Sequence, residues 1–215
     1  MSHPSRLLLP GLGLCLALLP SSVDALDLPA RIPARSEGLW QIDRQGTFRD
    51  GTTTINVQKV WTICLDAKAD RALHEFEVRE NQASAAMRKE SCGKPIFTLV
   101  EDTLSSTMRC SGLSAATGKI GSSEFTRFTT FVSADEVRSE TMIANRNNAA
   151  ESDGRLTTRM TRIGACDGSL KPGGMMLMHW RVNGEETLKA RQIHNIYREI
   201  SDFRAQTAAQ LDEAR

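Results

Sequence analysis

The feature that most limits how this chain can fold is a period-two alternation of apolar and polar residues between positions 38 and 166. The clearest run, residues 55–63, sets branched and aromatic side chains among Thr, Asn, Gln and Lys. Successive side chains of a strand point to opposite faces, and such residues favour strands. Because similar short runs recur between turn signals, we predict an all-β domain, an antiparallel curled sheet, sandwich or partial barrel.

Inside this domain we expect some elements of other kinds. Residues 66–76 are predicted to form a short helix that Asp66 caps. Residues 77–95 are polar and are predicted to be a loop. A hairpin turn is expected at residues 101–102, and a further loop over residues 147–154, where Asn and Asp-Gly signals gather.

The first 25 residues have the layout of a secretory signal peptide. Arg6 precedes an apolar run over residues 7–19, and a Pro-Ser-Ser break and modest or small residues follow. The run is about 13 residues long, whereas a helix that crosses the roughly 30 Å bilayer core needs about 20. We therefore predict that residues 1–25 are removed, that the protein is periplasmic or secreted, and that no transmembrane segment is left. An uncleaved anchor is the alternative.

Cleavage after residue 25 would leave four of the five cysteines: Cys64, Cys92, Cys110 and Cys166. An even number in an exported chain favours two disulfides. Zinc sites favour cysteines only a few residues apart, whereas the closest two here are 18 residues apart. Four cysteines can pair in several ways. We predict the sequential pairing, Cys64–Cys92 and Cys110–Cys166.

The segments on either side of the β-rich domain (38–166) have other patterns. Residues 26–37 contain two prolines and are expected to be an extended lead-in. Residues 167–184 are predicted to be a linker and a short apolar strand. Apolar residues then recur at spacings of three and four, which predicts an amphipathic helix over 185–215. We expect this helix to pack on its own domain, with a homodimer or partner contact through residues 185–207, or a membrane-surface role, as alternatives.

The charge and the aromatic residues exclude two kinds of binding face. The formal net charge is +1 and the basic residues are interleaved with acidic ones, so we predict no nucleic-acid surface. Trp40, Trp61 and Trp180 lie in apolar runs, where we expect them in the core. That expectation leaves no aromatic platform for a sugar.

The common catalytic motifs are missing from the sequence. Residues 112–119 resemble a phosphate loop but lack its glycine spacing and its Ser or Thr after Lys. No Gly-x-Ser-x-Gly elbow is present. We therefore predict that the protein is not an enzyme and has no cofactor. A triad assembled from distant residues stays open, so a periplasmic hydrolase is an alternative.

One cluster of residues offers soft metal ligands. Met176, Met178 and His179 supply thioethers and an imidazole, which suit Cu(I). In a strand, Met176 and Met178 share a face and His179 points away. Methionine also fills irregular apolar gaps, and we favour that role, so no metal is predicted.

Several short motifs resemble those of one family. They are Gly-Leu-Trp at residues 38–40, Cys64 after the second strand, Cys92 and Cys110 in mid-chain, and Arg-Ile-Gly-Ala-Cys at residues 162–166. Over roughly residues 37–166 the chain resembles the bacterial secreted family known as domain of unknown function 3617. A Pro often precedes Gly-Leu-Trp in that family, whereas Ser36-Glu37 stands here. The resemblance implies a periplasmic or secreted β-rich domain with disulfides, and no activity.

Three functional hypotheses follow. The first is a non-catalytic binding or envelope-associated module, whose partner is an unknown protein or a small apolar ligand. The second is a lipocalin-like carrier, which requires a cavity lined by Phe125, Phe128, Ile143 and Met160. The third is the hydrolase.

Overall fold

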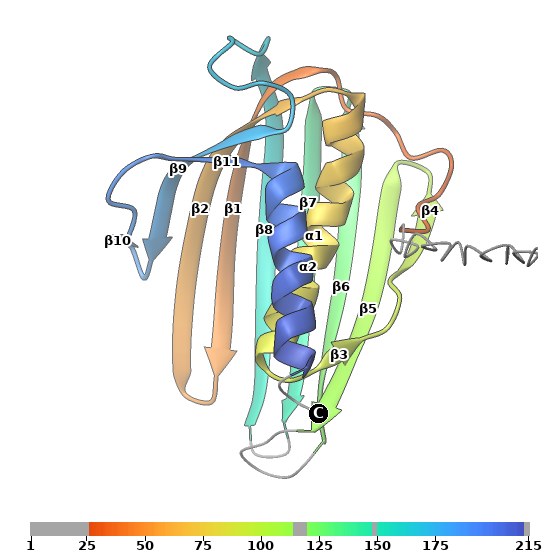
Figure 1. The fold of residues 1–215 in the computed structure, drawn as a ribbon, viewed down its shortest axis with the longest axis vertical. Coiled ribbons are helices and arrows are strands. Elements are labelled where there is room, and N and C mark those ends of the chain that lie inside the picture. Colours follow the sequence, from red (N-terminus) through yellow and green to blue (C-terminus); the bar gives the residue numbers. More distant parts are fainter. Residues whose placement is uncertain (1–25, 114–119, 148–149, 213–215) are drawn as a thin grey trace, which may run out of the picture.

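One curled antiparallel sheet, with two helices on one of its faces, makes up the fold (Figure 1). The structure is a computed structural model that describes residues 26–113, 120–147 and 150–212. The predicted signal peptide, residues 1–25, lies outside the described residues. Residues 26–37 lead into the first strand without regular structure, as expected.

The elements follow one another along the chain as a series of strands interrupted by one helix and ended by another. They are β1 (Gly38–Asp50), β2 (Thr53–Leu65), α1 (Ala67–Met87), β3 (Ser91–Cys92), β4 (Ile96–Val100), β5 (Thr103–Leu113), β6 (Ile120–Ser133), β7 (Glu136–Asn147), β8 (Ala150–Gly164), β9 (Gly174–Val182), β10 (Glu185–Glu186), β11 (Gln192–Asn195) and α2 (Ile196–Asp212).

The strand order shows that the sheet is open. It runs β10-β9-β2-β1-β8-β7-β6-β5-β3, with β11 beside β9 and β4 beside β5. Every pair is antiparallel. No pairing between described residues joins the two ends of this order. The prediction of an antiparallel curled sheet is confirmed, and the sheet is neither a sandwich nor a closed barrel.

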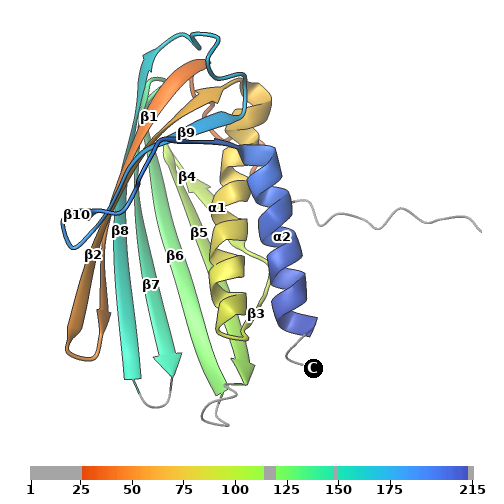
Figure 2. The same cartoon turned by 60° about the vertical axis from the view of Figure 1, so that its left-hand side comes forward.

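The alternation in the sequence separates the two faces of the sheet. Trp40 and Ile42 of β1 are buried, whereas Gln41 between them is exposed. Figure 2 shows both helices on the side that we call the inner face, and the opposite side is the outer face. On the inner face Trp40, Ile42, Ile63 and Met160 pack with Leu73 of α1 into one core cluster. We call this part of the inner face the packed half.

Helix α1 begins where the sequence predicts and continues much further. The Asp66 carboxylate accepts a hydrogen bond from the Ala69 amide at 2.7 Å, as expected of an N-cap. The helix ends at Met87, so the prediction of a loop over 77–95 is wrong. Its second half is rich in helix-forming residues, and Val78 and Ala85 are buried beside β5 and β6. Two of the polar residues that suggested a loop, Glu77 and Glu80, face the sheet and pair with Arg127 and Arg44.

Helix α2 is shorter than predicted. It starts at Ile196, because residues 192–195 pair with β9 as β11. The Asn195 side chain accepts a hydrogen bond from the Tyr197 amide at 3.1 Å. The Phe203 ring lies 5.6 Å from that of Phe76 on α1. The helix therefore packs on its own domain, as expected, and the homodimer through residues 185–207 stays a prediction.

The disulfides join Cys64 to Cys166 and Cys92 to Cys110. The predicted sequential pairing is wrong because the sheet brings other positions together. Strand β3 pairs with β5 so that Cys92 stands directly opposite Cys110. At the other end, Leu39 of β1 is the partner of both Cys64 and Gly164, which places the end of β8, and Cys166 after it, beside Cys64.

The loop predicted over residues 147–154 is wrong at the described positions, because β7 continues to Asn147 and β8 starts at Ala150, and residues 148 and 149 lie outside the described residues. Gly154 is a strand residue that stands opposite both Phe48 and Ile143. A Cβ atom at Gly154 would lie 2.7 Å from a ring carbon of Phe48. Glycine at this position leaves room for the Phe48 ring rather than making a turn.

Candidate functional site

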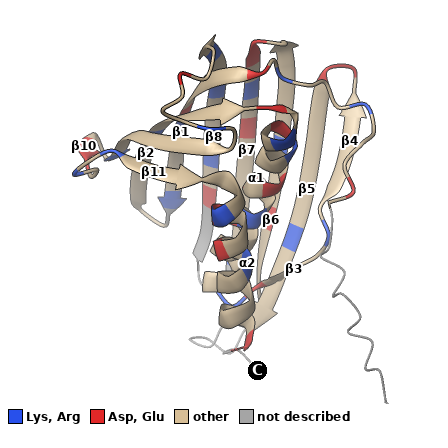
Figure 3. Ribbon diagram, turned by 45° about the horizontal axis from the view of Figure 1, so that its top comes forward, with Lys and Arg blue, Asp and Glu red and all other residues tan. Residues whose placement is uncertain are grey.

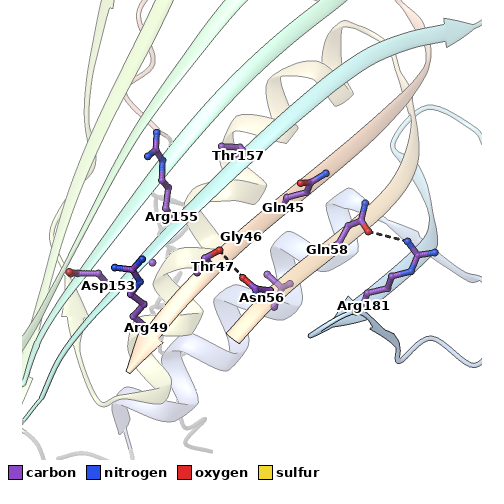
Figure 4. Close-up of a pocket in the computed structure, with 13 residues that line it drawn as sticks. Gln45, Gly46, Thr47, Arg49, Asn56, Gln58, Asp153, Arg155, Thr157 and Arg181 are labelled. Atoms are coloured by element: carbon purple, nitrogen blue, oxygen red, sulfur yellow. Dashed lines mark hydrogen bonds between the residues drawn. The ribbon is translucent and has the colours of Figure 1, made fainter. Parts of the chain in front are cut away.

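The outer face has a wide polar hollow of about 770 Å³ (Figure 4). Many of its side chains already bond to one another. The Thr47 hydroxyl donates to the side-chain amide oxygen of Asn56 at 3.0 Å, and Arg181 donates to that of Gln58 at 3.1 Å. Figure 3 shows acidic and basic positions interleaved along the strands. Small-molecule sites combine apolar walls with a few polar groups, and this hollow lacks an apolar wall.

The inner face has a groove of about 430 Å³ beside the helices. Its residues come from β1, β2, β6, β7, β8, β9, α1 and α2. The apolar members are Phe48, Val57, Ala83, Met87, Phe125, Ile143, Leu156, Trp180 and Phe203, and the polar members are Arg44, Lys59, Glu77, Glu80, Asn81, Ser84, Arg127, Thr141 and Gln206.

Strand pairing builds the apolar wall of the groove. Val57 and Leu156 stand on either side of Gly46, which carries no side chain between them. Phe48 and Ile143 stand on either side of Gly154. The two glycines thus leave space into which larger side chains of the neighbouring strands extend. The wall is open to solvent, since its members from β1, β2, β7 and β8 are only half-buried.

Two ion pairs close the polar end of the groove. Arg44 donates to Glu80 at 2.9 Å, and Arg127 lies 2.5 Å from Glu77. Burial alone would lower the pKa of Arg44, but Glu80 and Glu77 outweigh it and raise that pKa. Burial alone would likewise raise the pKa of Glu80, but Arg44 and Lys59 hold it below its usual value. Arg44 and Glu80 therefore stabilise each other's charged forms.

A third cation, Lys59, lies between two indole rings. Its ammonium is 5.4 Å from the ring centre of Trp180 and 5.9 Å from that of Trp61. Such distances are those of cation–π contacts. No carboxylate of the described residues forms an ion pair with Lys59 within 4.0 Å.

A smaller pocket of about 140 Å³ adjoins the groove and shares Arg44, Lys59, Glu80 and Trp180 with it. Its far side includes Glu199 from α2 and His194 from β11. The His194 Nδ1 atom lies 2.7 Å from a carboxylate oxygen of Glu199. This pocket extends the groove past Lys59, and Trp61, Phe76, Met175 and Leu177 line it beside the polar residues.

The four residues predicted to line a carrier cavity occupy three places. Phe125 and Ile143 line the groove, Met160 is buried in the packed half, and Phe128 is 41% exposed. Phe128 and Phe125 are three residues apart on one strand, so they point to opposite faces.

Trp180 is one of the groove residues that the sequence pattern does not identify. It was predicted to lie in the core with Trp40 and Trp61, but 45% of its surface is exposed. Its position follows from the register of β9 on β2. Val60 pairs with His179 and Trp61 with Leu177, so Met178 between them has no partner on β2. This β-bulge changes which residues face the helices. No periodicity in the sequence marks a bulge.

The three copper candidates all lie on β9. Met176 and His179 stand opposite Thr62 and Val60, which are two residues apart and so share a face. Met178 is the residue that the bulge inserts, and the bulge places His179 on the same face as Met176, so the prediction that His179 points away is wrong. His179 Nδ1 lies 3.0 Å from Glu186. Within the described ranges, no group of three or more His, Cys, Asp or Glu side chains has the arrangement of a metal site.

The comparisons with known proteins concern the domain rather than a function. No curated protein matches the chain. Among solved structures, the S-type phycobiliprotein lyase CPES from Guillardia theta is similar over 61% of this chain and 90% of its own, with 13% identity and a TM-score of 0.27. That score carries no argument about function. Residues 35–166 match the family described as "Protein of unknown function (DUF3617)", and the chain therefore belongs to the DUF3617 family.

Proposed function

We propose that the protein is a non-catalytic, extracytoplasmic binding module that holds a small apolar ligand in the groove of its inner face. The observation that carries this proposal is the open apolar wall formed by Phe48, Val57, Ile143 and Leu156. A concave apolar surface with a few convergent polar groups is the usual form of a ligand site. A volume of about 430 Å³ lies within the usual range for such sites.

The energetics favour an occupant. Covering a half-exposed Leu, Ile or Phe side chain recovers roughly 1 kcal/mol of transfer free energy. Several of these side chains contribute to one wall, so an apolar ligand along it gains several such increments. Burial of the ligand's own apolar surface adds to that gain. Loss of translational and rotational freedom opposes it.

The proposed location rests on two observations of different kinds. The N-terminal pattern is that of an export signal, and two disulfides persist where the surroundings are oxidising. None of the helices within the described residues is both long enough and apolar enough to cross a bilayer. Intact-mass measurement after export to a bacterial periplasm tests this part, and we expect the mass of residues 26–215 with two disulfides.

The binding proposal is tested with N-phenyl-1-naphthylamine, an uncharged probe that fluoresces in apolar sites. We expect saturable binding to the exported protein, and at least about tenfold weaker binding by the Ile143→Arg variant, because placing a charge in an apolar wall costs more than about 1.4 kcal/mol. Met142→Arg is the matched control, since Met142 is the neighbouring exposed residue on the other face of β7. That variant is expected to bind like the wild type.

Circular dichroism and urea unfolding first establish that both variants fold. Absence of probe binding by the folded wild type would overturn the proposal. Equal weakening by both variants would also overturn it, because binding would then not depend on the inner face. A stoichiometry near one is expected, because the groove and the small pocket adjoin each other and share four lining residues.

A further inference from the structure

We infer that the groove takes an anionic, single-chain amphiphile whose head group binds at Lys59 and whose chain lies along the apolar wall. This inference rests on the proposed function and names its class of ligand. It starts from a difference among the three cations of the groove. Arg44 and Arg127 form close ion pairs, whereas Lys59 contacts two indole rings and acts on Glu80 only from beyond 4.0 Å.

Both arginines already bind carboxylates of the fold. Arg44 binds Glu80 at 2.9 Å and its guanidinium lies 5.0 Å from the Trp61 ring centre. Arg127 binds Glu77, and it also donates to Ser139 at 2.9 Å and Thr129 at 3.1 Å. Side chains held this way orient one another and keep the polar end of the groove rigid.

Lys59 has a different environment. Its described contacts are the two indole rings, which attract a cation but accept no ordinary hydrogen bond. An ammonium carries three N–H donors. Its donors are therefore available to a ligand at the place where the groove meets the small pocket. Glu80 is held by Arg44, and Glu199 by His194.

The balance of charge favours an anion at this point. The groove is lined by three cations, Arg44, Lys59 and Arg127, and by two carboxylates, Glu77 and Glu80. Within this lining, pairing of the arginines with the carboxylates leaves the positive charge of Lys59, and Glu199 of the adjoining pocket lies 2.7 Å from His194 rather than beside Lys59. The rings of Trp61 and Trp180 exclude water from its sides, which strengthens a charge-assisted hydrogen bond. A cationic head would instead meet an uncompensated like charge.

The strand geometry aligns the rest of the ligand. Lys59, Val57 and Ile55 are alternate residues of β2, so they follow one another on the inner face over about 13 Å. Val57 adjoins Gly46 and Leu156, and Ile55 adjoins Phe48. A head group at Lys59 thus directs an alkyl chain over a continuous apolar strip, which matches a medium-length fatty carboxylate.

The test compares laurate, dodecanol and dodecylamine as competitors of the bound naphthylamine probe. They share a chain length and differ in the charge of the head. We expect laurate to bind about tenfold more tightly than dodecanol, the effect of one hydrogen bond to a charged group, and dodecylamine to bind most weakly. Lys59→Met keeps the length of the side chain without its charge. It is expected to remove the preference for laurate and to leave dodecanol binding unchanged.

Lys171→Met is the matched control, because Lys171 is exposed and lies outside the lining of the groove and small pocket; this variant should keep the laurate preference. Equal affinity for all three amphiphiles, or a laurate preference that survives Lys59→Met, would overturn the anionic class while leaving the apolar groove intact. Failure of all three to displace the probe, together with absent probe binding, would overturn the proposed function itself.

Discussion

Two isoleucines on one strand show how the inner face of this sheet is divided. Ile63 of β2 is fully buried in the packed half, whereas Ile55, on the same strand and face, is 39% exposed beside the groove. Figure 1 shows α1 and α2 in front of β6–β8, while the lower end of the β1–β2 hairpin stands clear of both. The same alternation of residues thus provides a core where helices cover it and an open wall where they do not.

This comparison separates stability from binding. In the packed half Trp40, Ile42 and Met160 have lost nearly all contact with water, and the folding free energy already includes that gain. In the groove the apolar side chains still contact water, so a ligand that covers them gains the remaining free energy of burial. Residues of the two halves should therefore respond differently to the same truncation.

The largest expected effect concerns the disulfides. Cys64–Cys166 closes a separation of 102 residues beside the packed half, whereas Cys92–Cys110 closes only 18. In the loop-entropy model these links stabilise the fold by about 4.7 and about 3 kcal/mol. Urea unfolding of the Cys64→Ala/Cys166→Ala and Cys92→Ala/Cys110→Ala double variants measures both losses. A larger loss for the second variant would contradict this order, and peptide mapping of the wild type checks the pairing.

The next effect tests the division of the inner face directly. Ile63→Ala should lower the free energy of unfolding by about 3 kcal/mol, since it leaves a cavity in a fully packed site. Ile55→Ala removes the same atoms from a partly exposed site and should cost less than about 1 kcal/mol. Chemical denaturation of the two variants compares them on one strand. Similar losses would mean that the groove contributes to stability as the core does, and would weaken its assignment as a ligand site.

The sequence predicts the sheet well because strand periodicity is a local property. Each residue's face follows from its neighbours, so the β-rich domain and its hairpin at residues 101–102 are confirmed. The cap at Asp66 is local too and is confirmed at 2.7 Å. These features need no knowledge of what lies across the molecule.

The site depends on contacts that no local pattern contains. The ion pair of Arg44 with Glu80 joins β1 to α1, 36 residues apart. The pairing of Cys64 with Cys166 depends on β8 lying beside β1 rather than on proximity in sequence. Trp180 enters the groove through a bulge in β9. Sequence reasoning identified Phe125 and Ile143 as cavity residues, but it could not show that the helices would leave one half of the face open.

The smallest expected effect is a pH-dependent loss of stability that originates in the packed half of the inner face. His74 of α1 is buried beside Arg35, with 3.4 Å between Nε2 and the guanidinium nitrogen. Burial, and then the charges of Arg35, Arg127 and Arg71, hold the pKa of His74 well below its usual value. The lining of the groove contains no histidine, although His194 lines the adjoining pocket beside Glu199. Acidification through the range of an ordinary histidine should therefore destabilise the packed half through His74.

The sign of the effect follows from which state binds the proton. In the unfolded chain His74 takes up a proton below about pH 6.5, whereas the folded protein keeps it neutral. His74 therefore causes no loss of unfolding free energy above about pH 6.5. Below that pH the free energy of unfolding falls, by about 1.4 kcal/mol at pH 5.5. Urea midpoints at pH 7.5 and 5.5 measure this loss. His74→Phe should remove most of it, and His179→Gln, a change at a half-exposed ring, should not. A His74→Phe variant that loses as much stability as the wild type between these pH values would show that His74 is not the group responsible.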